Sequence, residues 1–176
     1  SRRDGGQRSP RVVGLEWLIT RTHGGLYVAD SQTFFSQHSF TLRDPASPDS
    51  GLRPIMLKNL RRLDVALMGF PGEHLKFHPY FGAGFTLGEV GTAAAEPPFA
   101  NADQLNYAEA VISDEKVAFT PLFLAGGQYR LRKFSVFGQA TLSPAQHRFI
   151  LYNGRPWNFG YEVGLRYNIG TSIDKD

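Results

Sequence analysis

The sequence predicts an all-β protein, an up-and-down antiparallel transmembrane β-barrel of eight strands. Residues 157–169 alternate strictly between apolar side chains and small, amide or charged ones, which is the two-residue period of an extended strand. The apolar set is long and aromatic, whereas a soluble half-buried strand usually has a shorter, mixed aliphatic face. Composition agrees, with 19 Gly, 14 Phe, 7 Tyr and 11 Pro.

The length of this segment fits a membrane crossing. Its residues at about 3.3 Å each extend roughly 43 Å, and a tilted membrane strand needs only about 9–11 residues. No run approaches the roughly 18 apolar residues of a membrane helix. The apolar face would contact lipid, while Glu162 and Arg166 would point into the barrel.

Length and composition limit the number of domains and the kinds of site and partner that we expect. A chain of 176 residues is one domain, which we place at 11–170 with a tail at 171–176. Residues 1–10 are basic and polar, which is typical of a flexible tail or loop, and they contain no apolar run of a signal peptide. Without cysteine there is neither a disulfide framework nor a thiolate metal site. Because charges and aromatic residues fall on opposite strand faces, we expect no nucleic-acid partner.

The first part of the chain contains one clear strand and one ambiguous segment. Residues 11–21 alternate, with Trp17 among the apolar set and Glu16 opposite, and a turn follows at 22–25. Residues 26–42 read either as one strand or as two short ones, and the adjacent Phe34 and Phe35 suggest a bulge. The turn-forming residues that follow predict a loop, which we place at 43–56.

The middle of the chain returns to clear alternation. We expect strands at 57–70 and 75–91 with a tight turn at 71–74 between them. In the second of these, Lys76, His78 and Tyr80 share the inward set. Pro79 is unusual inside a sheet and fits a closed barrel only near the rim or at a bulge.

The last part supplies three more strands, at 116–131, 133–143 and 157–169. Their connections alternate between a short turn at 131–132 and longer segments at 92–115 and 144–156, the first with a short helix around 104–110. The count is eight if 26–42 forms two strands. If it forms one, a partner strand lies upstream of residue 1.

Three segments of the chain resemble a known group of proteins. They are 62–67 (Arg-Leu-Asp-Val-Ala-Leu), 77–84 (Phe-His-Pro-Tyr-Phe-Gly-Ala-Gly) and 160–169 (Gly-Tyr-Glu-Val-Gly-Leu-Arg-Tyr-Asn-Ile). In pattern they are similar to the small outer-membrane β-barrels of Gram-negative bacteria, the OmpA-like and opacity-like group. The resemblance implies the bacterial outer membrane, outer-membrane lipid around the barrel, and an anchoring, structural or docking role through the loops 43–56, 92–115 and 144–156.

The strand faces assign the candidate functional residues. Because an eight-stranded barrel has room only for its own side chains, we expect a charge-paired polar interior, with a selective path or small-ligand site as the alternative. The expected interior polar network is Glu16, Arg62, Asp64, Lys76, His78, Gln128, Arg130, Glu162 and Arg166. The expected lipid-facing aromatic residues are Trp17, Phe77, Phe81, Phe85, Phe119, Phe123, Tyr129, Trp157, Phe159, Tyr161 and Tyr167.

Two other functional classes of β-barrel protein remain as alternatives. A lipid A deacylase-like barrel would carry a His-x-Ser pair on a late strand, but Ser143 has no histidine two residues before it, and His147 lies in a predicted connection. A soluble lipocalin-like barrel would turn the aromatic faces inward around an apolar ligand. We expect no catalytic residues, no cofactor and no metal, since the five histidines are scattered.

Overall fold

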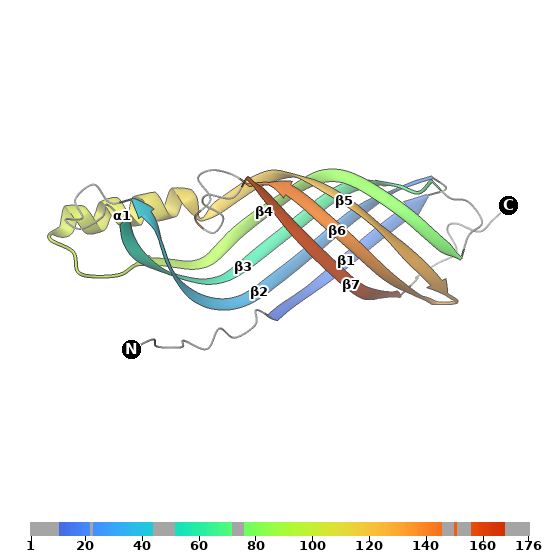
Figure 1. Ribbon diagram of the computed structural model, residues 1–176, viewed down its shortest axis with the longest axis horizontal. Coiled ribbons are helices and arrows are strands. Elements are labelled where there is room, and N and C mark those ends of the chain that lie inside the picture. The colour runs from blue at the N-terminus through green and yellow to red at the C-terminus, as the bar shows by residue number, and fades with distance from the viewer. Residues whose placement is uncertain are drawn as a thin grey trace.

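The computed structural model describes residues 11–21, 23–43, 52–71, 76–145, 150 and 156–167. These residues form one antiparallel sheet in which each strand is hydrogen-bonded to the next along the chain (Figure 1). The elements are β1 (Arg11–Arg21), β2 (Gly24–Arg43), β3 (Leu52–Gly69), β4 (Phe77–Ala95), α1 (Ala102–Glu115), β5 (Val117–Leu131), β6 (Phe134–Pro144) and β7 (Trp157–Tyr167). The predicted all-β, up-and-down antiparallel architecture is confirmed.

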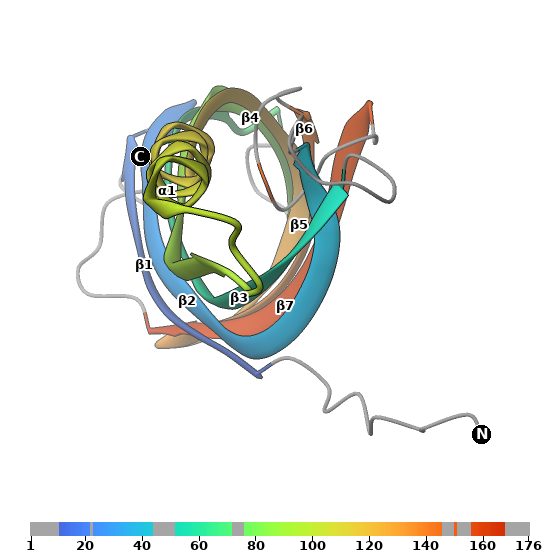
Figure 2. The ribbon, with the colours of Figure 1, turned by 90° about the vertical axis from the view of Figure 1, so that its left-hand side faces the viewer.

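The sheet curls around its long axis, so that one face becomes an interior and the other an exterior (Figure 2). Side chains alternate between the two faces as the sequence pattern requires. In β4, for example, Tyr80 is buried inside while Phe77, Phe81 and Phe85 are exposed outside. No helix in the described ranges is long and apolar enough to span a membrane.

The ambiguous segment at 26–42 forms one strand rather than two, so the described residues contain seven strands. The polar stretch around Asp30 does not end β2, because its residues stay paired with β1 on one side and β3 on the other. The Asp30 carboxylate also pairs with the Arg61 guanidinium of β3 at 2.9 Å. The predicted bulge at Phe34 and Phe35 is confirmed as a register shift between Thr33 and Ser36.

The connections are short at one end of the sheet and long at the other. A tight turn joins β5 to β6, where Arg132 adopts a positive φ of 53°. At the opposite end α1 lies between β4 and β5 (Figure 1). The predicted helix at 104–110 is confirmed and extends over Ala102–Glu115. Pro79 lies near the start of β4, paired with Gly127, in agreement with a place near the rim.

Two of the predicted loops begin or end inside strands. Residues 52–56 belong to β3 and 92–95 to β4, and these strand ends pair with each other from Ile55 and Ala95 onward. At 92–95 the alanines gave no contrast between the faces, and at 52–56 the inward set has the opposite parity to the rest of β3, so the sequence pattern hid both strand ends. Residue 43 ends β2, and residues 44–51 of the predicted loop, most of 144–156, and the predicted tails at 1–10 and 171–176 lie outside the described residues.

Beyond the curled sheet, the ends of β3 and β4, the helix α1 and the start of β5 form what we call the end module, comprising residues 52–60, 90–95, 102–118 and 150. Its apolar core brings β3, β4 and β5 against the helix and contains Ile55, Leu57, Leu60, Val90, Ala108, Ile112, Ala118 and Ile150. The inward set of β3 changes parity at Asn59, which has a positive φ of 58°. This change turns Ile55 and Leu57 toward the helix.

Local contacts fix the start of the helix. The Asn101 side chain accepts a hydrogen bond from the Gln104 backbone N–H at 2.9 Å, which satisfies one of the free donors of the first turn. The buried Arg53 donates to the carbonyl oxygens of Glu96 and Pro98 at 3.0 and 2.7 Å and lies over the Phe99 ring. The segment before α1 is therefore held against β3.

Candidate functional site

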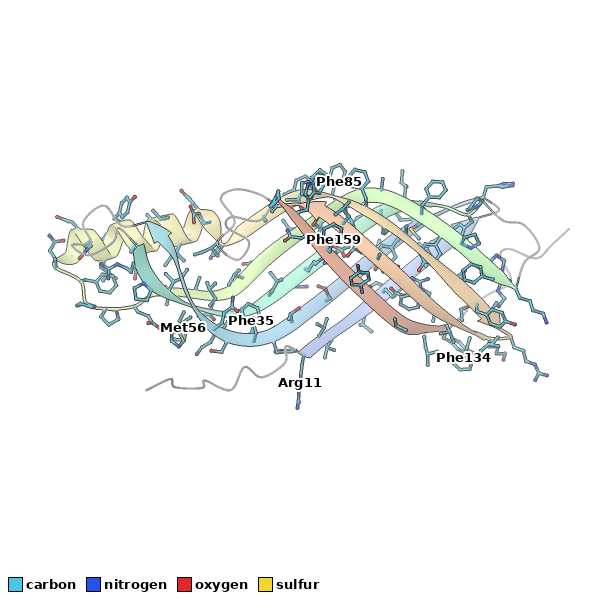
Figure 3. All side chains as sticks on the ribbon, in the orientation of Figure 1. Arg11, Phe35, Met56, Phe85, Phe134 and Phe159 are labelled. Carbon is cyan, nitrogen blue, oxygen red and sulfur yellow. The ribbon has the colours of Figure 1, made fainter. Side chains whose placement is uncertain are left out.

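The exterior of the sheet is apolar and exposed. Phe85, Phe134 and Phe159 are among the aromatic side chains on the outward face (Figure 3). All eleven of the aromatic residues expected to face lipid are exposed, with Tyr161 reaching 86%. Phe85 and Phe119 stack on neighbouring strands with ring centroids 5.1 Å apart. The apolar side chains of this face are contiguous, whereas those on the surface of a soluble protein are mostly scattered.

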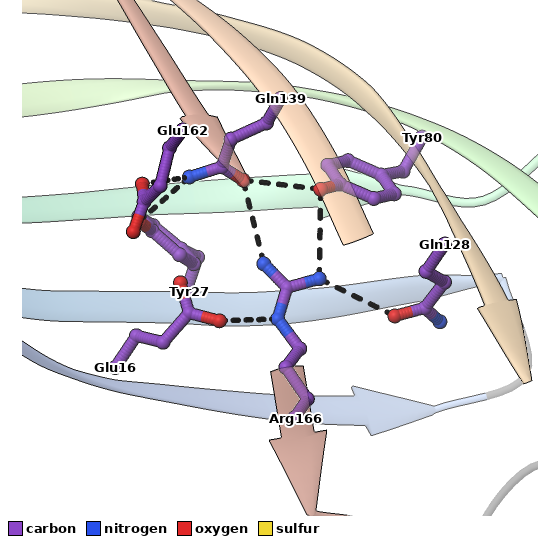
Figure 4. A network of polar contacts seen from close by, with 7 residues as sticks. All are labelled: Glu16, Tyr27, Tyr80, Gln128, Gln139, Glu162 and Arg166. Carbon is purple, nitrogen blue, oxygen red and sulfur yellow. Dashed lines mark hydrogen bonds and ion pairs between the residues drawn. The ribbon is translucent and has the colours of Figure 1, made fainter. Parts of the chain in front are cut away.

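The interior holds a network of polar side chains contributed by six strands (Figure 4). Its members lie on β1, β2, β4, β5, β6 and β7 and are Glu16, Tyr27, Tyr80, Gln128, Gln139, Glu162 and Arg166. Such a network rigidifies a fold when its donors and acceptors are satisfied. We treat it as the candidate functional site.

Arg166 is the centre of the network. Its Nε donates to Oε1 of Glu16, and its two terminal nitrogens donate to Tyr80 Oη at 3.5 Å, Gln128 Oε1 at 3.3 Å and Gln139 Oε1 at 3.4 Å. These acceptors lie on β1, β4, β5 and β6. One buried guanidinium thus connects the two edge strands, β1 and β7, to strands in the middle of the sheet.

The Arg166 guanidinium packs against an aromatic ring. The Arg166 guanidinium carbon lies 3.8 Å from the centroid of the Phe137 ring, a cation–π contact. The ring in turn lies against Gly164, where a Cβ atom would be only 2.6 Å from it. Glycine at this position therefore gives Phe137 the room that it needs to support Arg166.

Gln139 links the remaining members. Its Nε2 donates to Tyr27 Oη at 3.0 Å and to Glu162 Oε2 at 2.8 Å, and its Oε1 accepts from the Tyr80 hydroxyl at 3.1 Å. A neutral amide that donates on one side and accepts on the other connects the acidic Glu162 to the cationic Arg166. The amide thereby extends the network across the interior.

A second cluster lies on β3 and β4. Arg62 pairs with Asp64 at 2.8 Å and donates to Thr86 Oγ1 at 3.2 Å. Asp64 and Thr86 are buried. Both ionised side chains of this part of β3 are therefore neutralised within the sheet's interior, as burial requires.

Most of the expected interior residues occupy the inner face, but the structure does not bring all of them together. Glu16, Gln128, Glu162 and Arg166 share one network, and Arg62 and Asp64 form the second cluster. His78 is buried and Arg130 half-buried, outside these two groups. Lys76 is a correction: it precedes β4 and is exposed, because the strand begins one residue later, at the end of the sheet.

Three network members were not predicted as part of the interior network: Tyr27, Tyr80 and Gln139. Except for Gln128, the predicted set contained only charged residues and histidine, so these three neutral side chains were not included. Strand parity was the available signal for Tyr80 and Gln139, since each lies on the same face as predicted members. For Tyr27 the unclear pattern of 26–42 hid that signal.

The network does not contain the residues of a deacylase-like site. None of its seven residues is a serine, cysteine or histidine, so the serine–histidine pair of such a site is not formed by these side chains. Ser143 is buried at the end of β6, and His147 lies outside the described residues. The part of the chain that the structure describes has no cluster of three metal-ligating side chains.

A shallow groove lies between α1 and the end of β4, with a volume of about 360 Å³. Its floor is the small-residue run 91–95, and its helix wall includes Leu105, Glu109 and Ile112. Near it, the His38 ring is 2.6 Å from a Glu96 carboxylate oxygen. The groove belongs to the end module and is separate from the interior network.

The chain matches no protein-family model, no curated protein and no solved structure.

Proposed function

We propose that this protein is a small outer-membrane β-barrel of a Gram-negative bacterium. The barrel anchors the end module to the membrane, and the end module docks to a partner. The observation that carries the proposal is the exposed apolar exterior around a polar, ion-paired interior. In water such an exterior would promote association. In a bilayer the same face is solvated by lipid.

The dimensions of the apolar exterior fit a bilayer. On β4 the outward apolar set runs from Phe77 to Leu87. Those residues at about 3.3 Å each, tilted by about 40°, cover roughly 25 Å, the height of the apolar band of outer-membrane barrels. Outward charges begin at the end of this set, where Arg61 lies opposite Glu89 of β4 and forms an exposed ion pair with Asp30. This boundary supports a membrane-embedded band with a water-exposed end.

The interior argues against a lipocalin-like function. A barrel that binds an apolar ligand needs an apolar cavity, but Arg166, Glu16, Gln128 and Gln139 occupy the interior and bond to one another. The aromatic side chains that would line such a cavity are on the outside. We therefore propose a structural role for the interior.

The end module supports the docking role. It has its own apolar core and a capped helix, so it presents a rigid surface beyond the apolar band. It also lies at the end of the sheet with the long connections, which in outer-membrane barrels faces outward from the cell. Tyr107 and the groove beside β4 are exposed on it.

Membrane fractionation with gel electrophoresis tests the anchoring. The chain, expressed in a Gram-negative host behind an export signal, should fractionate with outer membranes and need detergent for extraction. Unboiled and boiled samples should migrate differently, because a folded barrel resists denaturing detergent. Recovery in the soluble fraction without detergent, with no heat-dependent shift, would contradict the proposal. That result would favour the lipocalin-like alternative.

A further inference from the structure

We propose that the gap between β1 and β7 receives one additional β-strand, supplied by a polypeptide segment outside residues 1–176, which runs antiparallel to both edges. The inference rests on the proposed membrane function. We call this segment the added strand.

The two edges of the sheet are unpaired in the described residues. β1 pairs only with β2, and β7 only with β6. Their backbone N–H and C=O groups on the gap side therefore have no strand partner. Lipid offers no hydrogen bonds, so open sheet edges do not occur within the hydrocarbon region of a membrane. In the proposed setting something must pair with these edges.

Strand direction and number indicate a single strand. In an antiparallel sheet of seven strands, the first and the last run in the same direction. One more strand that runs opposite to both completes an antiparallel ring of eight, and bacterial single-chain barrels have an even number. Direct pairing of β1 with β7 would instead be parallel.

The interior contacts limit how wide the gap can be. Arg166 of β7 reaches Glu16 of β1 at the tips of their two side chains (Figure 4). Two strand spacings are roughly 10 Å, a distance that these extended side chains together cover. Tyr27 and Gln139 also join β2 to β6 across the interior. A second copy of the whole sheet would enter only by breaking these bonds.

The chemistry of the edges defines the added strand. Oε2 of Glu16 is buried and has no hydrogen-bond partner among the described residues. Glu16 bonds to the Arg166 guanidinium through Oε1, which leaves the other carboxylate oxygen for a further cation. The added strand should therefore turn a lysine or arginine inward at this level. Its outward side chains should be apolar, like their neighbours Leu15 and Leu165, which are 68% and 73% exposed.

Residues 1–10 and 168–176 do not have this composition. Residues 1–10 contain no aliphatic or aromatic side chain apart from Pro10. Residues 168–176 contain only two isoleucines and end in Asp-Lys-Asp. Neither provides the alternating run of about 9–11 residues that a membrane strand requires.

Disulfide capture tests the proposal directly, because the chain contains no cysteine. Single variants Leu15→Cys on β1 and Leu165→Cys on β7 report on the edges, and Val136→Cys on the interior strand β6 is the matched outward control. The probe is an eleven-residue peptide of alternating valine and threonine, with a central inward lysine and one outward cysteine. All proteins are folded in detergent micelles.

Both edge variants should capture the peptide at least about tenfold more than the Val136→Cys control. Replacement of the peptide lysine by glutamate should lower capture by roughly tenfold, the loss of one charge-assisted hydrogen bond. Glu16→Gln should lower capture of the lysine peptide and leave capture of the glutamate peptide unchanged or higher. Bound peptide should also slow amide exchange in β1 and β7.

Three results would overturn the proposal. An intramolecular disulfide in the Leu15→Cys/Leu165→Cys double variant without peptide would show that the edges meet directly. Disulfide-linked dimers of the edge variants would show that a second copy fills the gap. Equal capture by the edge and control variants would show that no strand site exists. In a protein that fractionates with membranes, these results refute the added strand alone, whereas recovery in the soluble fraction refutes the proposed function with it.

Discussion

Arginine at the centre of the apolar exterior should distinguish a membrane-embedded face from a water-exposed one. Phe123 lies midway along β5, between Ala83 and Leu142 on the adjacent strands, and is 49% exposed. Tyr107 on α1 is 46% exposed but belongs to the end module. The substitutions Phe123→Arg and Tyr107→Arg therefore place the same charge at two aromatic sites of matched exposure.

The expected magnitudes differ widely between the two sites. An arginine at the bilayer midplane of a β-barrel costs about 2–4 kcal/mol, which lowers the folding equilibrium constant roughly 30- to 700-fold at about 1.4 kcal/mol for each factor of ten. A surface substitution in water changes the free energy of unfolding by less than about 0.5 kcal/mol. Tyr107→Arg should therefore be nearly neutral.

Urea titration of the protein in lipid vesicles, followed by tryptophan fluorescence and by the heat-dependent gel shift, measures both effects. Phe123→Lys should repeat the result at the same depth. If Phe123→Arg unfolds at the same urea concentration as the unsubstituted protein, then the exterior is not solvated by lipid, and the argument from exposed aromatic residues fails.

Three further substitutions test the interior and the helix. Arg166→Met should cost about 3–5 kcal/mol by leaving the Glu16 carboxylate buried without its cation, and the added change Glu16→Leu should recover much of that loss in the same urea titration. Gly164→Ala should cost about 1–3 kcal/mol by displacing the ring beneath the guanidinium, while Gly138→Ala, whose Cβ would be 4.0 Å from the nearest atom, should not; an equal loss in both would contradict this account. Asn101→Ala should remove about 1 kcal/mol of helix stabilisation, seen as faster amide exchange confined to α1.

The curled antiparallel sheet could be predicted because its inner and outer faces differ strongly in side-chain chemistry. Strand β1 begins and ends at the predicted residues, since apolar side chains recur at every second position from Val13 to Ile19 and a turn follows. The exposed aromatic residues followed from the same parity. Where both faces are small, as in Ala93–Ala94–Ala95, alternation carries no information and the strand was predicted as a loop.

The interior network could be predicted only in part, because a sequence shows which face a residue occupies and not which partner it reaches. Glu16 and Arg166 are 150 positions apart and meet only because the sheet curls. Gln139 is neutral, yet it makes contacts on both sides. Lys76 shares the parity of the inward residues, but the strand starts after it, and the position of a strand end depends on tertiary contacts.

The Glu16–Arg166 pair also constrains the order in which the chain assembles. Its two members lie on the first and last described strands, so it forms only after every intervening hairpin has been placed. Until then the carboxylate, the guanidinium and the amides around them must keep their hydrogen bonds to water. Contacts of such high sequence separation form slowly. We therefore expect the interior to lose its water late in folding, when β7 comes within reach of β1.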